Sequence, residues 1–120
     1  MLTEWYIINF FGIDSKYYTN EYVAYLWEES ANEEYMKSGI FVATAIMIRR
    51  LVCGEIRGCD LGETVHTLTT SRNPAEVLSS ESFYNSFINV VNSVRTKLDN
   101  PNMTLSTLEI NYFYFTDVSI

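Results

Sequence analysis

IFVATAIMIRRLVC, residues 40–53, is the most strongly β-forming segment of the chain, because it is rich in β-branched and large apolar residues. Successive side chains of a strand point to opposite faces of the sheet. One face would carry Ile40, Val42, Ile46, Ile48 and Val52, and the other Phe41, Ala43, Ala45, Met47 and Leu51. Both faces are apolar, whereas a strand with one face in water alternates between apolar and polar residues.

Upstream of this segment, the sequence predicts a strand and then a helix. Residues 2–11 (LTEWYIINFF) are aromatic and β-branched, again with apolar residues on both sides. A helix follows from Thr19, a residue suited to capping its N-terminus, to Lys37, and Gly39 ends it.

Downstream, the sequence predicts a strand, a helix and a final strand. Residues 63–70 form a weaker, threonine-rich strand suited to a sheet edge. Asn73–Pro74–Ala75–Glu76 is a helix-start signal, and this helix should reach Asp99, with a break near Ser79 and Ser80. Residues 104–115 close the domain.

The order βαββαβ predicts one α+β domain over residues 1–120. Its architecture should be a four-stranded, mainly antiparallel sheet with two helices, a ferredoxin-like sandwich or a variant of it. This architecture hosts many unrelated functions, so it does not indicate an activity.

Two helices cover only one face of such a sheet, so an apolar second face needs another cover. The predicted patch consists of Trp5, Ile7, Phe11, Ile46 and Ile48, or their opposite-face neighbours. We expect a homo-oligomer formed through the sheet face, with a different protein or a bound ligand as other possible covers. The alternative is that the sheet curls, or that residues 12–18 and 116–120 lie across it.

The composition of the chain excludes some classes of binding partner and indicates the cellular compartment. Fifteen acids against eight bases give a net charge of −7, which disfavours direct binding to nucleic acid or to an anionic membrane. No apolar run is long enough to span a bilayer, and no secretory signal is evident, so we expect a cytoplasmic protein.

Cys53 and Cys59 should then be partly buried thiols, with a redox pair or a metal site that includes His66 as less favoured interpretations. The sequence indicates no catalytic residue, metal or cofactor.

An acidic, tyrosine-rich surface is predicted on the first helix. It would offer charges and aromatic anchors to a basic groove on another protein. The alternative is a solvated helix face whose acids pair with Arg49 or Arg50. The predicted partner-binding residues are Glu28, Glu29, Glu33, Glu34, Tyr22, Tyr25 and Tyr35.

An arginine- and glycine-rich turn is the second candidate surface, because guanidinium groups can hold a phosphate or a carboxylate. Arg49 and Arg50 should point to opposite faces of their strand, so at most one of them can face a given site. The alternative is that these charges protect a sheet edge. The predicted ligand-binding residues are Arg49, Arg50, Arg57, Arg72, His66, Phe83 and Tyr84.

These features favour a non-catalytic interaction protein that masks another protein. With ten Asn and no Gln, the composition is typical of an AT-rich genome and suits a phage or mobile-element inhibitor acting on a host protein in the host cytoplasm. One alternative is a homo-oligomer that binds a small anionic, nucleotide-like ligand. Another is a small enzyme that uses His66 with Cys53 or Cys59.

Overall fold

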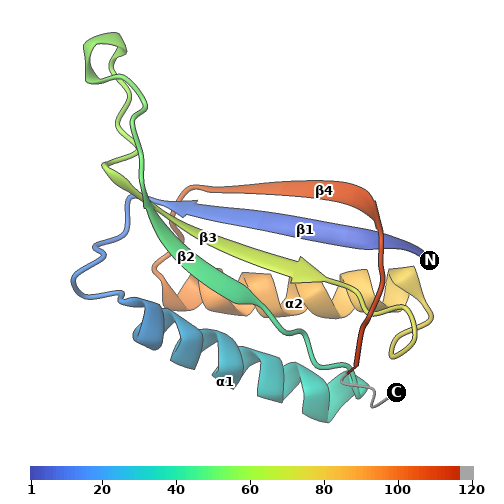
Figure 1. The fold of residues 1–120 in the computed structure, drawn as a ribbon. Helices are drawn as coiled ribbons and strands as arrows, with labels where there is room; N and C mark the ends of the chain where they lie inside the picture. Colours follow the sequence, from blue (N-terminus) through green and yellow to red (C-terminus); the bar gives the residue numbers. More distant parts are fainter. Residues whose placement is uncertain (117–120) are drawn as a thin grey trace.

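The computed structural model describes residues 1–116 (Figure 1). The four strands form one antiparallel sheet in the order β2-β3-β1-β4, and both helices lie on the same side of it. The predicted βαββαβ order and antiparallel sheet are confirmed. The elements are β1 (Leu2–Phe11), α1 (Asn20–Ser38), β2 (Ala45–Arg50), the short 3₁₀ turn η1 (Glu55–Arg57), β3 (Thr64–Ser71), α2 (Ser80–Lys97) and β4 (Met103–Asn111).

The register of the sheet places the apolar core between the strands and the helices. Ile8 of β1 lies opposite Leu68 of β3 and Leu105 of β4, and residues opposite one another share a face of the sheet. Tyr6 and Phe10 flank Ile8 on this inner face. They pack with side chains of both helices in a single buried cluster that includes Val23, Leu26, Trp27, Phe87, Val90 and Val94.

The outer face of the sheet carries the alternate residues and has no helix over it within residues 1–116. Trp5 and Ile7 of β1 lie on this face, as does Met47 of β2, so the prediction of apolar residues there is right in part. Ile46 and Ile48 do not belong to it. Ile46 packs against the helix-covered core, and Ile48 lies opposite the buried His66.

β3 is a central strand, and its prediction as a sheet edge is wrong. It pairs with β1 on one side and β2 on the other, so β2 and β4 are the edges. Its polar threonines are tolerated because their hydroxyls find partners within the fold. Thr70 Oγ1 donates to Ala43 O at 2.9 Å, and Thr67 Oγ1 donates to Asn9 Oδ1 at 2.7 Å.

The helix ends follow the capping signals, with one correction. Thr19 caps α1 by accepting from Tyr22 N at 3.2 Å, as predicted. α2 begins at Ser80 instead of near Pro74, because the Asn73 signal makes only an isolated turn in which Val77 N donates to Asn73 O at 2.9 Å. Ser79 then caps the helix by accepting from Ser82 N at 3.1 Å.

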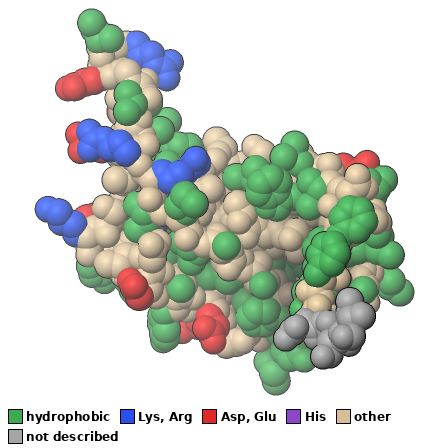
Figure 2. All heavy atoms as spheres, viewed as in Figure 1, with side chains coloured by type: hydrophobic (Ala, Val, Ile, Leu, Met, Phe, Trp, Pro, Cys, Tyr) green, Lys and Arg blue, Asp and Glu red, His purple; other side chains and the backbone are tan. Residues whose placement is uncertain are grey.

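Residues 51–63 form an arm that stands away from the body of the molecule (Figures 1 and 2). The predicted strand 40–53 is therefore reduced to the six residues of β2. Leu51 N donates to Glu63 O at 2.8 Å and closes the base of the arm. Near the tip, the side chain of Ile56 is fully exposed.

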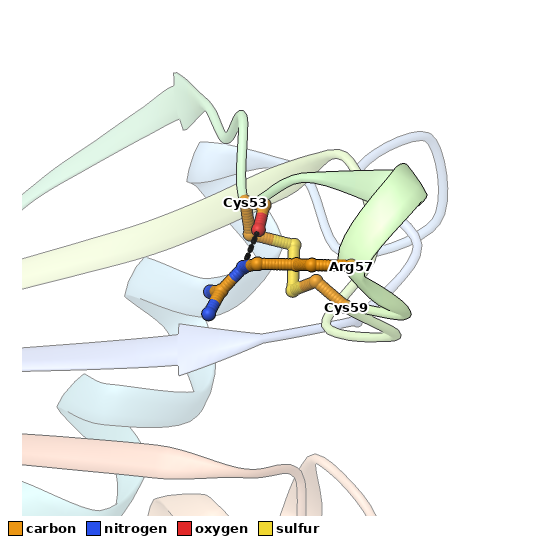
Figure 3. Close-up of a disulfide and its surroundings, with 3 residues drawn as sticks. All are labelled: Cys53, Arg57 and Cys59. Carbon is orange, nitrogen blue, oxygen red and sulfur yellow. Dashed lines mark hydrogen bonds between the residues drawn. A yellow bond between two sulfur atoms is a disulfide. The ribbon is translucent and has the colours of Figure 1, made fainter.

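A disulfide between Cys53 and Cys59 closes the tip of the arm (Figure 3). The prediction of two free thiols is therefore wrong. Gly54 and Gly58 both adopt positive φ and reverse the chain so that the cysteine Cα atoms are 5.8 Å apart, within bridging distance. Arg57 Nε donates to Cys53 O at 2.6 Å across the same ring.

A largely buried ion pair ties β1 to the segment between β3 and α2. Arg72, 7% exposed, donates to both carboxylate oxygens of Glu4 at 2.8 and 3.0 Å and to Val77 O at 2.9 Å. Ser80 Oγ also donates to Glu4 at 2.6 Å. Arg72 thus has a structural partner for its charge.

No helix within residues 1–116 combines the length and apolar character needed to cross a bilayer.

The Glu4–Arg72 pair makes stability depend on pH. Hydrogen bonding from Arg72 holds the pKa of Glu4 below its ordinary value of 4.5, so the unfolded chain binds this proton more tightly. The pair therefore stabilises the fold above about pH 4.5, and this contribution is lost as the pH falls through the lowered pKa. In urea unfolding near pH 7, Glu4→Gln should lower the unfolding free energy by about 2 kcal/mol. It should also reduce the loss of stability on acidification.

The control for this prediction is Glu55→Gln, on the exposed arm, which should leave both quantities unchanged. An identical acid response in wild type and Glu4→Gln would contradict the assignment.

The disulfide should order the arm while contributing little to global stability, because the arm lies outside the core. In Cys53→Ser/Cys59→Ser, we expect the unfolding free energy to change by less than about 1 kcal/mol. Hydrogen exchange of the amides in residues 51–63 should rise at least about tenfold. Unfolded, non-reduced wild type should show no titratable thiol, and detection of two thiols would contradict the pairing.

Candidate functional site

A cavity of about 290 Å³ opens on the outer face of the sheet, near the lower end of the range for small-molecule sites. β1 contributes Trp5 and Ile7, β2 contributes Met47 and Arg49, and β3 contributes Thr67. Ala45 and Thr69 complete the lining, and Ile46, whose side chain packs against the core, also borders the cavity. The cavity thus combines an indole ring and aliphatic groups with a guanidinium group and hydroxyls.

A row of hydrogen bonds crosses all four strands beside this cavity. Arg49 of β2 donates to Thr67 Oγ1 of β3 through Nε at 3.2 Å and Nη2 at 2.9 Å. Thr67 Oγ1 donates to Asn9 Oδ1 of β1 at 2.7 Å, and Asn9 Nδ2 donates to Thr104 Oγ1 of β4 at 3.2 Å. The row fixes the position of each polar group in it.

The structure does not gather the predicted arginine set into one site. Arg49 borders the cavity, whereas the guanidinium of Arg50 lies 3.7 Å from Glu63 at the base of the arm. The two residues thus separate, as the alternation of the strand predicts. Arg57 lies at the tip of the arm, and Arg72 forms an ion pair with Glu4.

The remaining predicted ligand-binding residues lie in or against the core. His66 is fully buried on the inner face, with Nε2 2.8 Å from Tyr18 O. Phe83 is buried, and Tyr84 lies beside Tyr6, with ring centroids 6.0 Å apart. The residues of the predicted Cys/His enzyme do not form one site, because the two cysteines are joined in a disulfide on the arm and His66 is in the core.

Some side chains of the predicted acidic face make hydrogen bonds or ion pairs within the fold, and others are exposed. Glu34 is buried between the helices, where it accepts from Ser86 Oγ at 2.9 Å and Asn89 Nδ2 at 3.1 Å. Glu29 pairs with Lys97 at 2.6 Å, and this hydrogen bond holds the pKa of Glu29 below its ordinary value. The partner of Glu29 is therefore on α2, and is neither Arg49 nor Arg50.

The other members of the acidic face lie outside the helix–helix contact. Glu28 and Glu33 are exposed. Tyr22 stacks on Tyr18 with ring centroids 5.6 Å apart, and Tyr25 continues this aromatic row at 6.5 Å from Tyr22. Tyr35 meets Phe41 edge to face at 6.3 Å. Docking of another protein on this face stays a prediction.

Asn9 and Thr67 are site residues that the sequence reasoning missed. Asn9 is a single amide among the apolar residues of LTEWYIINFF, and that interruption was the available signal. Its role depends on pairing with Thr67, 58 residues away in sequence, and only the strand register brings the two together.

One family model matches residues 1–116 of the chain, and its description is SAM lyase. The description names an enzyme, so the prediction of a non-catalytic protein is wrong. No curated protein is similar enough in sequence to be matched to the chain.

Solved structures with similar folds include two de novo designed proteins and a natural one. The first design shares 12% identity, with a TM-score of 0.49, over 94% of this chain and all of that one. The second, with a ferredoxin fold, shares 10% identity, with a TM-score of 0.48, over 99% and 96%. A putative PII-like signaling protein of Thermus thermophilus shares 14% identity, with a TM-score of 0.43, over 92% and 88%. Because these TM-scores are below 0.5, the similarities do not contribute to the functional assignment.

Proposed function

The chain belongs to the SAM lyase family, and on that premise we propose that it cleaves a carbon–sulfur bond of S-adenosylmethionine at the outer-face cavity. The match over residues 1–116 carries this proposal. A lyase breaks such a bond without water and without a redox partner. The proposal replaces the inhibitor function predicted from the sequence and is nearer to the alternative of a nucleotide-like ligand.

The chemistry of the cavity supports this substrate. S-adenosylmethionine has a flat adenine, a positively charged sulfonium and an amino-acid end. The indole of Trp5 offers a face on which an adenine can stack or over which a cation is attracted. Ile7 and Met47 provide aliphatic surface, and the hydroxyl of Thr69 can meet a polar group of the ribose.

The apolar lining also favours the bond cleavage itself. When the carbon–sulfur bond breaks, its electron pair stays on sulfur and the charged sulfonium becomes a neutral thioether. A poorly hydrated site raises the free energy of the cation relative to the neutral product. The carbon that is released either forms a bond to another group of the same molecule or gains a double bond as the neighbouring carbon loses a proton.

Turnover of S-adenosylmethionine tests the proposal directly. Purified protein should release a neutral thioether, detected by liquid chromatography, and the other fragment should take up no ¹⁸O from labelled water. Trp5→Leu should lower kcat/KM at least about tenfold, because it removes the aromatic face. NMR of the second fragment would distinguish a ring from an alkene.

The matched control is Tyr25→Leu, an exposed aromatic on α1, which should leave turnover unchanged. Absence of thioether, or transfer of the methyl group to another molecule, would rule out the lyase reaction.

We further propose that a second copy of the chain covers the outer face around the cavity. Met47 and Leu108 are 58% and 47% exposed on this face, and soluble monomers rarely leave an apolar patch of this kind uncovered. Closed symmetric assemblies are the common solution.

Light scattering tests the assembly. Wild type should have a mass above that of one 13.9 kDa chain, and Leu108→Lys should shift it toward the single-chain mass by placing a charge in the contact. Tyr25→Lys, on α1, should keep the wild-type mass. A single-chain mass for wild type at micromolar concentration would contradict the proposal.

A further inference from the structure

We infer that Arg49 binds the carboxylate at the amino-acid end of the substrate, and that Thr67 and Asn9 are positioning residues that hold its guanidinium for this purpose. The inference rests on the proposed function and names the group that determines specificity at that site. The inference requires that the positive charge of Arg49 is not neutralised by an acid and that some of its N–H donors are unused. It also requires that the guanidinium is held in place at the polar end of an otherwise apolar cavity.

Arg49 has no carboxylate partner within residues 1–116. Arg50 and Arg72 each lie within 4.0 Å of a glutamate, whereas Arg49 donates only to the neutral Thr67 Oγ1. In a chain with fifteen acids and eight bases, an arginine without an acid is available to an anionic ligand. Its guanidinium has five N–H donors, and the planar fork matches a carboxylate.

Other arginines in the described part of the chain also lack a carboxylate partner, but they do not face the cavity. Arg57 donates to Cys53 O at the tip of the arm, and Arg95 donates to Pro101 O. Of these three, Arg49 is the one that lines the cavity. Arg49 therefore combines a guanidinium that has no carboxylate partner with a position on a cavity large enough for a ligand.

The hydrogen-bonded row fixes the direction in which Arg49 is held. Thr67, only 8% exposed, gives its hydroxyl proton to Asn9 Oδ1 at 2.7 Å, which leaves its oxygen lone pairs for Arg49. Asn9 Oδ1 is in turn fixed as an acceptor because Asn9 Nδ2 donates to Thr104. A donor held in this way loses little freedom when an anion binds.

The lining assigns opposite ends of the cavity to opposite ends of the substrate. Trp5, Ile7 and Met47 suit the adenine and the carbon chain around sulfur, and the guanidinium suits the carboxylate, which is the single anionic group of S-adenosylmethionine. Arg49 should therefore distinguish S-adenosylmethionine from its decarboxylated analogue, which keeps the adenosine, the sulfonium and the amine.

The experiment compares the KM for S-adenosylmethionine with the Ki of the decarboxylated analogue as a competitive inhibitor, because a ring that closes through the carboxylate cannot form from the analogue. In wild type, the KM should be at least about tenfold lower than the Ki, the effect expected of one charged hydrogen-bonded pair. Arg49→Met should raise the KM for S-adenosylmethionine by a similar factor and leave the Ki of the analogue unchanged, so that the preference disappears. Lys16→Met, which removes the same charge from an exposed loop, should retain the preference.

Two variants of Thr67 test the positioning role. Thr67→Val removes the oxygen that Arg49 contacts and should raise KM for S-adenosylmethionine several-fold, while Thr67→Ser keeps that oxygen and should restore the wild-type value. Circular dichroism and urea unfolding will show whether each variant is folded. If Thr67→Val and Thr67→Ser have the same KM, Thr67 does not position Arg49.

The outcomes separate this inference from the proposed function. If the KM and the Ki are equal in wild type, or Arg49→Met keeps the preference, the carboxylate assignment is wrong and the lyase proposal stands. If wild type does not cleave S-adenosylmethionine, the lyase proposal fails, and calorimetric binding of the same two compounds decides the assignment. Tighter binding of S-adenosylmethionine that is lost in Arg49→Met supports it, and equal or absent binding overturns it.

Discussion

The antiparallel register between β1 and β3 determines which side chains of this protein reach the core and which reach solvent. Because side chains alternate along a strand, the pairing of Ile8 with Leu68 turns Tyr6 and Phe10 toward the helices, and Trp5, Ile7 and Asn9 away from them. A shift by one residue would bury Asn9 and expose Ile8. The free energy of burying the core therefore also sets the composition of the outer face, and with it the cavity and the row that holds Arg49.

Much of the fold could be predicted from local signals. Thr19 and Gly39 mark the ends of α1 by capping chemistry that acts within a few residues. The central place of β3 could not be predicted, because threonine-rich strands are tolerated inside a sheet only when their hydroxyls find partners. Those partners, Ala43 and Asn9, are distant in sequence. The disulfide was missed because the expected cytoplasmic location favoured free thiols, and the chain reversal that brings the two cysteines within bridging distance is a property of the folded arm tip.

The candidate site shows the same division between local and long-range information. Arg49 was singled out from the sequence because arginines bind anions, and alternation along the strand separated it from Arg50. Arg72 was singled out for the same reason, but its charge is committed to Glu4, which only the fold reveals. The enzymatic character was missed because the sequence carries no motif for a nucleophile or a metal cluster. The reaction proposed above needs neither, since a sulfonium already contains its leaving group.

The hydrogen bond from Leu51 to Glu63 closes the arm at its base, so the sheet is insensitive to the number of residues beyond that point. Loop-closure entropy grows only slowly with length, and the arm contributes nothing to the buried cluster. Insertions and deletions among relatives should therefore concentrate here. For the same reason, a peptide epitope or a reporter domain grafted between residues 51 and 63 should leave the rest of the molecule folded.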